Sequence, residues 1–192
     1  MRAKRLFVAI DLPEPVTSRL VELDPGLRGV RWMRQDQMHL TVGFFGDVEP
    51  ITEEALREKL SGIRFSKFFI PLNGIGTFPQ KGKPNVIWVG VGRGHPQLFH
   101  VYKRVQEAAL GAGLEPDLRS WHPHITIARC REVSAESVRP LLKAERDLDL
   151  GLVRVERFSL YSSIPGPLGS VYTRELEVHC SGGLRPPDVD LA

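Results

Sequence analysis

The chain has 192 residues, and 42% of them are apolar, which is enough to bury the core of one large domain or two small lobes. Its formal net charge of +3 falls short of an unstructured nucleic-acid-binding tail but permits an anionic ligand. No stretch approaches the roughly 18 apolar residues of a membrane span. Cys130 and Cys180 have neither metal spacing nor a disulfide framework. Together these features predict a soluble globular protein of the cytoplasm.

In the first half of the chain, apolar periodicity and turn residues predict alternating strands and helices. We expect a strand at 4–11, a helix at 14–25, a strand at 38–46, a helix opening near 52, and strands at 67–77 and 85–92. The last two strands are separated by residues 79–84, a basic loop rich in turn residues. Such a loop can contact a ligand, although a solvated loop is the simpler interpretation.

The second half predicts a helix at 95–111, stopped by Gly111 and Gly113, and then a strand at 122–129. A helix at 134–144 and long strands at 147–161 and 171–179 follow. We therefore expect one bilobal domain over residues 1–180, followed by a loose tail at 181–192.

One tetrapeptide pattern occurs twice, as His39-Leu-Thr-Val42 and as His124-Ile-Thr-Ile127. In a strand, residues two apart point to the same face, so each copy presents a His beside a Thr. Because strand, helix and motif strand follow one another in both halves, the pattern indicates an internal duplication. Such a duplication would place both motifs in one cleft between the lobes.

Two His-Thr pairs in one cleft suit metal-independent phosphodiester chemistry. Near neutral pH one imidazole can act as a general base while the other acts as a general acid, and the hydroxyls can donate to an anionic oxygen. The chain also lacks the Gly-Lys-Ser/Thr signature of a P-loop, which argues against nucleotide triphosphate hydrolysis.

The motifs and their surroundings resemble the 2H phosphoesterases, and more narrowly the RNA 2′,3′-cyclic phosphodiesterases, also called 2′-5′ RNA ligases. The resemblance covers nearly the whole chain. It includes residues 5–10, Trp32, residues 38–46, residues 123–129, and residues 160–163 followed by Gly169 and Tyr172.

The resemblance implies an α+β fold of two pseudo-symmetric lobes of antiparallel sheet, with outer helices and the active-site cleft between them. It implies hydrolysis of an RNA terminal 2′,3′-cyclic phosphate to a 2′-phosphomonoester, without a metal or cofactor. His39 would be the general acid and His124 the general base, while Thr41 and Thr126 would hold the phosphate oxygens. In reverse, the same site would give weak ATP-independent 2′-5′ ligation. The expected partner is an RNA end such as a tRNA half, bound by a monomer.

Arg129 is a further candidate for phosphate binding, because Arg makes planar contacts to phosphate. Strict alternation from His124 places it on the opposite face of the strand, so it reaches the cleft only if the strand contains a bulge. Several aromatic residues could stack a base, namely Phe7, Trp32, Phe45 and Tyr161. The core is the better interpretation for Phe7 and Phe45.

Two other functions are compatible with the sequence. One is a metal-dependent phosphohydrolase that uses His39, His122 and His124 as ligands, which leaves both Thr without a role. The other is a non-catalytic module that binds an RNA end without turning it over. Sensitivity to a chelator tests the first alternative, and product formation tests the second.

Overall fold

The computed structural model describes residues 2–92, 96–115, 120–167 and 169–181, so most of the predicted tail lies outside the described residues. No described helix is long and apolar enough to cross a membrane. In chain order the elements are β1 (Lys4–Asp11), α1 (Glu14–Glu22), β2 (Val30–Trp32), a short 3-10 helix (Gln35–Gln37), β3 (His39–Val48), α2 (Pro50–Ser61), β4 (Phe68–Phe78), β5 (Val86–Val91), α3 (Pro96–Gly111), β6 (His124–Cys130), α4 (Ala135–Ala144), β7 (Asp149–Val155), β8 (Arg157–Ile164) and β9 (Val171–His179).

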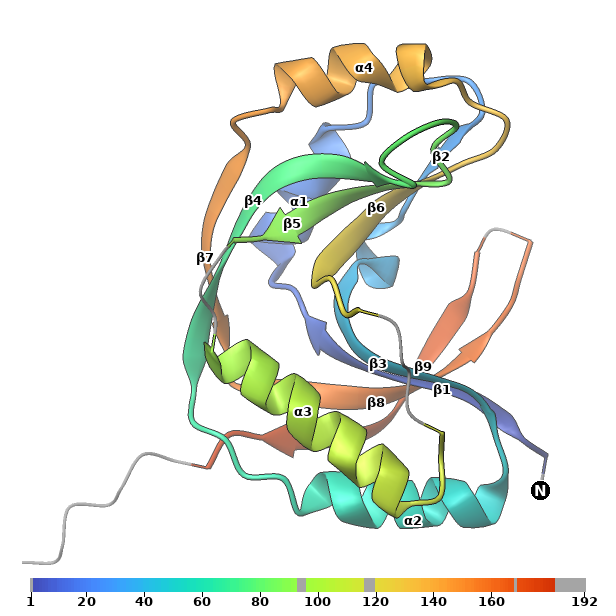
Figure 1. The fold of residues 1–192 in the computed structure, drawn as a ribbon, viewed down its shortest axis with the longest axis vertical. Coiled ribbons are helices and arrows are strands. Elements are labelled where there is room, and N and C mark those ends of the chain that lie inside the picture. The colour runs from blue at the N-terminus through green and yellow to red at the C-terminus, as the bar shows by residue number, and fades with distance from the viewer. Residues whose placement is uncertain (1, 93–95, 116–119, 168, 182–192) are drawn as a thin grey trace, which may run out of the picture.

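The strands form one antiparallel sheet in the order β7-β4-β5-β6-β3-β1-β8-β9, with β2 added beside β6. The sheet curls strongly, as Figure 1 shows. It has two halves, β3-β1-β8-β9 and β7-β4-β5-β6, which meet through a single residue pair, Leu40 with Ile125. The predicted α+β fold with antiparallel lobes is confirmed, and the lobes are halves of one continuous sheet.

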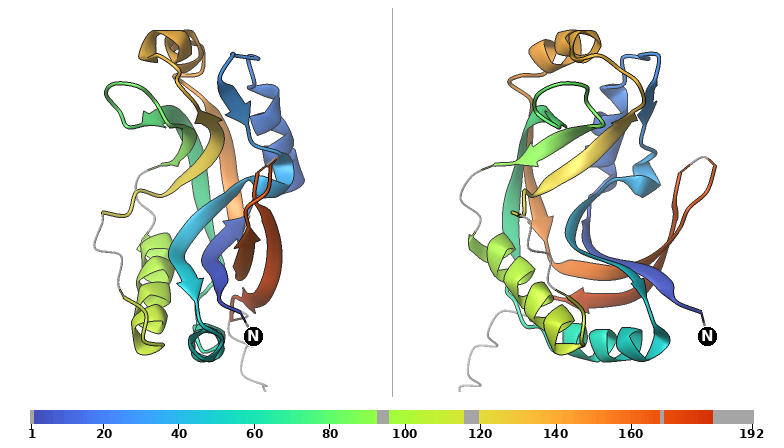
Figure 2. Two further views of the ribbon diagram at one scale, coloured as in Figure 1. Left: turned by 90° about the vertical axis from the view of Figure 1, so that its right-hand side faces the viewer. Right: turned by 45° about the vertical axis from the view of Figure 1, so that its right-hand side comes forward.

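The connections between the motif strands cross from one half to the other. Strand β2, which precedes β3 in the chain, pairs with β6 of the other half, and the indole of Trp32, the last residue of β2, donates to the Leu20 carbonyl of α1 at 2.9 Å. Helix α3, which precedes β6, lies against β3 and α2 instead (Figures 1 and 2). The two halves are therefore interlocked.

Helix α3 shows why the local sequence folds as it does. Its buried residues recur at helical spacing and face the sheet: Leu98, Val101, Val105, Ala108 and Ala109. The chain leaves the helix through Gly113, whose φ of +88° is a left-handed conformation that glycine adopts without strain.

The single strand predicted at 147–161 is wrong. The structure divides it at Glu156 into β7, which pairs with β4, and β8, which pairs with β1 in the other half. The buried apolar positions change parity at this point, from Val153 and Val155 to Phe158 and Leu160. A single flat strand would turn one of these sets away from the core, so the chain breaks and changes halves. Strand β2 is also absent from the prediction, because three residues carry little periodicity.

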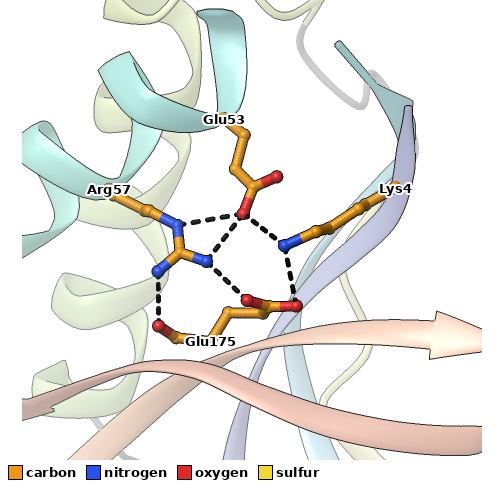
Figure 3. A network of polar contacts seen from close by, with 4 residues as sticks. All are labelled: Lys4, Glu53, Arg57 and Glu175. Carbon is orange, nitrogen blue, oxygen red and sulfur yellow. Dashed lines mark hydrogen bonds and ion pairs between the residues drawn. The ribbon is translucent and has the colours of Figure 1, made fainter. Parts of the chain in front are cut away.

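A cluster of four charged residues connects β1, α2 and β9, as Figure 3 shows. The Glu53 carboxylate accepts from Lys4 at 3.1 Å and from Arg57 at 2.7 Å, while Glu175 accepts from Lys4 at 3.0 Å and from Arg57 at 2.5 Å. The Glu53 side chain is only 9% exposed. A partly buried carboxylate of this kind stabilises the fold only while its partners remain.

We expect Glu53→Gln to lower the free energy of unfolding by about 2 kcal/mol, because it leaves two cations with one carboxylate. Urea denaturation at neutral pH measures the change. Glu54→Gln, an exposed neighbour on the same helix, is the matched control and should change stability by less than about 0.5 kcal/mol. Equal effects of the two variants would show that the cluster contributes no specific stability.

Candidate active site

The two motifs lie side by side around the residue pair that joins the halves. Because Leu40 faces Ile125 in an antiparallel pair, His39 lies beside Thr126, and Thr41 lies beside His124. Leu40 and Ile125 are fully buried on one face of the sheet. The two His and two Thr line one small pocket on the other face, with a volume of about 70 Å³. The structure thus brings together all four residues that the sequence singled out.

Arg129 lines the same pocket, and a bulge in β6 explains how it reaches it. Thr126 pairs with Trp88, but Ala128 pairs with the next residue, Ile87, so that Ile127 is an extra residue in the strand. The bulge reverses the alternation and turns Arg129 toward the His face. Strand β3 has the same irregularity, with Thr41 opposite Ala9 and Gly43 opposite Val8.

The two bulges place different residues at equivalent positions. In β3 the position that corresponds to Arg129 is occupied by Phe44, which is 44% exposed. The pseudo-symmetry of the site therefore breaks next to the motifs. The Arg129 guanidinium belongs to the pocket that holds both motifs, whereas the Phe44 ring lies outside that pocket, in a neighbouring cavity that Thr41 and His124 also line.

The backbone fixes the His124 ring. Its Nδ1 lies 2.7 Å from the His122 carbonyl oxygen, and since a carbonyl only accepts, Nδ1 carries the proton. In the neutral imidazole Nε2 then has a free lone pair. The ring of Phe78 meets the His124 ring edge-on, at 4.9 Å between centroids. Burial lowers the pKa of His124, and the hydrogen bond to His122 partly opposes this.

Aromatic rings surround His39. Phe7 stacks on it at 4.9 Å, and Tyr172 meets it edge-on at 5.3 Å. Burial lowers the pKa of His39 to about 4, even though Asp11 and a backbone hydrogen bond at Gln37 favour the charged form. His124 and Arg129 lower it further. The imidazole is therefore neutral at pH 7 in the free protein, and an anion in the pocket would favour its protonation.

This burial makes stability depend on pH. The folded-state pKa of His39 lies below its ordinary value of 6.5, so its contribution to stability is present above pH 6.5 and is lost as the pH falls toward 4. Between pH 7 and pH 5 we expect this group to lower the free energy of unfolding by about 2 kcal/mol. His39→Asn should remove that part of the pH dependence. His100→Asn, at an exposed position on α3, should not, and urea denaturation at both pH values compares them.

A second, larger cavity of about 290 Å³ adjoins the side of the pocket near Thr41 and His124. Its aromatic wall consists of Phe44, Phe78, Tyr102 and Trp121. Trp121 stacks on Tyr102 at 4.2 Å and donates to the Thr41 carbonyl at 3.2 Å, so the wall is connected directly to a motif strand. Sequence reasoning missed this wall, because nothing in the local pattern shows that α3 lies against β3.

The aromatic residues considered from the sequence lie elsewhere. Phe7 is buried under His39, Trp32 binds α1, and Phe45 packs against the core. The hydroxyl of Tyr161 donates to Asp11 at 2.5 Å. None of the four lines either cavity. Periodicity finds buried aromatics more readily than those that line a cavity.

The arrangement gives no support to a site with three His ligands. His122 is exposed and holds the His124 ring through its carbonyl group. Within the described ranges, no group of three or more His, Cys, Asp or Glu side chains could hold a metal ion.

Comparisons with known proteins agree with the geometry. The model of the family described as LigT like Phosphoesterase matches residues 10–88 and 90–172. The chain is 33% identical over 158 residues to the RNA 2′,3′-cyclic phosphodiesterase of Aeropyrum pernix, covering 81% of this chain and 89% of that protein. It is 31% identical over 188 residues to the Thermotoga maritima protein of the same name, covering 94% and 97%.

Solved structures show the same fold. Escherichia coli LigT superposes with a TM-score of 0.78 at 24% identity, covering 94% of this chain and 99% of that chain. A protein of Thermus thermophilus gives a TM-score of 0.74 at 26% identity, covering 91% and 97%. The family model spans most of the chain, and its match includes both His-Thr motifs. The chain therefore belongs to the LigT-like phosphoesterase family.

Proposed function

We propose that this protein hydrolyses the terminal 2′,3′-cyclic phosphate of RNA to a 2′-phosphomonoester. The observation that carries the proposal is the Leu40–Ile125 pair, which places each motif His beside the Thr of the other motif in one pocket with Arg129. Relatives from several organisms that share most of the chain are RNA 2′,3′-cyclic phosphodiesterases.

The pocket supplies the proton transfers that this reaction needs. Water attacks phosphorus while Nε2 of His124 takes its proton, and the bond from phosphorus to the 3′ oxygen breaks as His39 protonates that oxygen. Thr41, Thr126 and Arg129 donate to the non-bridging oxygens, on which negative charge accumulates. Binding of the anionic phosphate favours protonated His39, which is neutral in the free protein.

The adjoining cavity suits the nucleoside that carries the phosphate. Thr41 and His124 line both cavities, so a base that stacks on the aromatic wall would lie next to a phosphate in the small pocket. Escherichia coli LigT, 25% identical to this chain in that structure, was solved with 3′-AMP, a ligand that carries both a phosphate and a base.

The proposal extends to the substrate, the reverse reaction, the assembly and the location of the protein. An RNA end such as a tRNA half would be a substrate, and a 5′-hydroxyl RNA in place of water would give weak 2′-5′ ligation. One chain carries both motifs, which supports a monomer that acts as one bilobal domain of duplicated origin. The free thiols of Cys130 and Cys180 support a cytoplasmic location.

The test is to incubate the protein in EDTA with a short RNA that ends in a 2′,3′-cyclic phosphate, and to identify the terminal phosphate. We expect a 2′-phosphate. Activity that appears only when zinc or manganese is added would replace the proposal with the metal-dependent phosphohydrolase. Tight binding without product under any condition would leave a module that only binds RNA ends.

A further inference from the structure

Trp88 forms a flat platform on the catalytic face of the sheet. It pairs with Thr126 in β6, so its side chain lies on the same face as the motif residues. Its cross-strand partner in β4 is Gly76, and a Cβ atom there would collide with the indole. A Cβ at Gly90 would lie 3.3 Å from the same ring. The two glycines therefore allow the indole to lie down across the sheet.

The platform is continuous with the active site. Phe78 lies 5.3 Å from the Trp88 ring and 4.9 Å from the His124 ring, so the three rings form an unbroken path. A third cavity, of about 230 Å³, lies along this path and is lined also by Gln80 and Pro123. This cavity shares Phe78 with the aromatic wall of the larger cavity but extends from it toward Trp88 and Gln80, and the proposed hydrolysis uses neither of these two residues.

A basic loop follows the platform directly. Residues 79–84 connect β4 to β5, and the loop is closed by a hydrogen bond from the Asn85 amide to the Phe78 carbonyl at 2.8 Å. Lys81 and Lys83 are exposed in this loop. An apolar stacking surface beside exposed cations is the combination that binds a single-stranded nucleic acid, in which bases alternate with phosphates.

We propose that the Trp88 platform binds the nucleotide that precedes the terminal one in the RNA strand, with its base on the indole and its phosphate near Lys81 and Lys83. This inference rests on the proposed function, and it makes the enzyme selective for oligonucleotide ends over mononucleotides. We assign the platform to the RNA strand that carries the cyclic phosphate rather than to a second RNA molecule, because the nucleotide before the end always brings a phosphodiester to the two lysines.

The test compares a nucleoside 2′,3′-cyclic phosphate with a trinucleotide that ends in the same cyclic nucleotide. We expect kcat/KM for the trinucleotide to be at least about 5-fold higher in the native protein, from the stacking of one base. Trp88→Leu should remove this advantage through KM, and Trp88→Phe should restore part of it. Lys81→Gln/Lys83→Gln should lower the trinucleotide advantage and its dependence on salt. Every variant should hydrolyse the mononucleotide as the native protein does.

Lys59→Gln/Lys67→Gln is the matched control, because both residues are exposed and the change in net charge is the same. This double variant should leave kcat/KM for both substrates unchanged. Equal kcat/KM for the two substrates in the native protein would overturn the inference and leave the proposed function intact. A trinucleotide advantage that survives both Trp88→Leu and the double lysine variant would also overturn it. Failure to hydrolyse either substrate would instead contradict the proposed function itself.

Discussion

Replacing His124 with Ala should lower kcat for hydrolysis of an RNA 2′,3′-cyclic phosphate by about 10²–10⁴-fold, the usual contribution of a positioned general base. His39→Ala should have an effect of similar size, because the leaving 3′ oxygen then departs without a proton. The two losses should not add in full in the double variant, since both His act in one step. Initial rates in EDTA, with product identified by its terminal phosphate, measure all three variants.

His122→Ala is the control that separates the mechanisms. The His122 side chain is not needed to orient His124, because the hydrogen bond to Nδ1 comes from the backbone. The variant should therefore keep its rate within a few-fold of native. A loss as large as that of His124→Ala, together with inactivation by EDTA, would favour the three-His metal site and contradict the two-His mechanism.

Thr126→Val should lower kcat by about 10²-fold, since it removes one donor to an oxygen that gains charge in the transition state. Thr126 lies beside His39, the proposed acid, and Thr41 lies beside His124, so Thr41→Val should have a comparable effect on the other side of the phosphate. Val has nearly the shape of Thr, so the change tests the hydroxyl rather than the packing. Steady-state kinetics should show the loss mainly in kcat.

Thr173→Val, at an exposed position in β9, is the matched control and should be silent. If Thr126→Val raised KM alone and left kcat intact, the hydroxyl would hold the substrate and the transition state equally. That result would contradict its proposed role in stabilising developing charge.

The sequence was sufficient for the parts of the site that depend on alternation. A His and a Thr two residues apart share a face of any strand, and the pocket contains both pairs. Alternation failed at Arg129, because a bulge at Ile127 cannot be read from residue types that are equally common in regular strands. At the bulge two consecutive residues, Ile127 and Ala128, are both buried. This departure from alternation can be recognised only when the burial of each residue is known.

Contacts between distant elements were beyond the reach of local patterns. The parity change between Val155 and Phe158 was present in the sequence and marks the break between β7 and β8. By contrast, Tyr102 reaches the cavity only because α3, which precedes β6 in the chain, lies against β3 of the other half instead. Tertiary packing of this kind decides which aromatic residues face a ligand.

The interlocked connections have a consequence for folding. The first half of the sheet is built from strands near both ends of the chain, and the strands of the second half lie between them in the sequence. Strand β2, which precedes β3, pairs with β6, and helix α3, which precedes β6, packs against β3. Unfolding one half would strip the other of its packing, so the protein should unfold in a single cooperative transition. Amide protons of β3 and β6 should then exchange only through global opening. The catalytic residues thus lie in the part of the molecule that opens last.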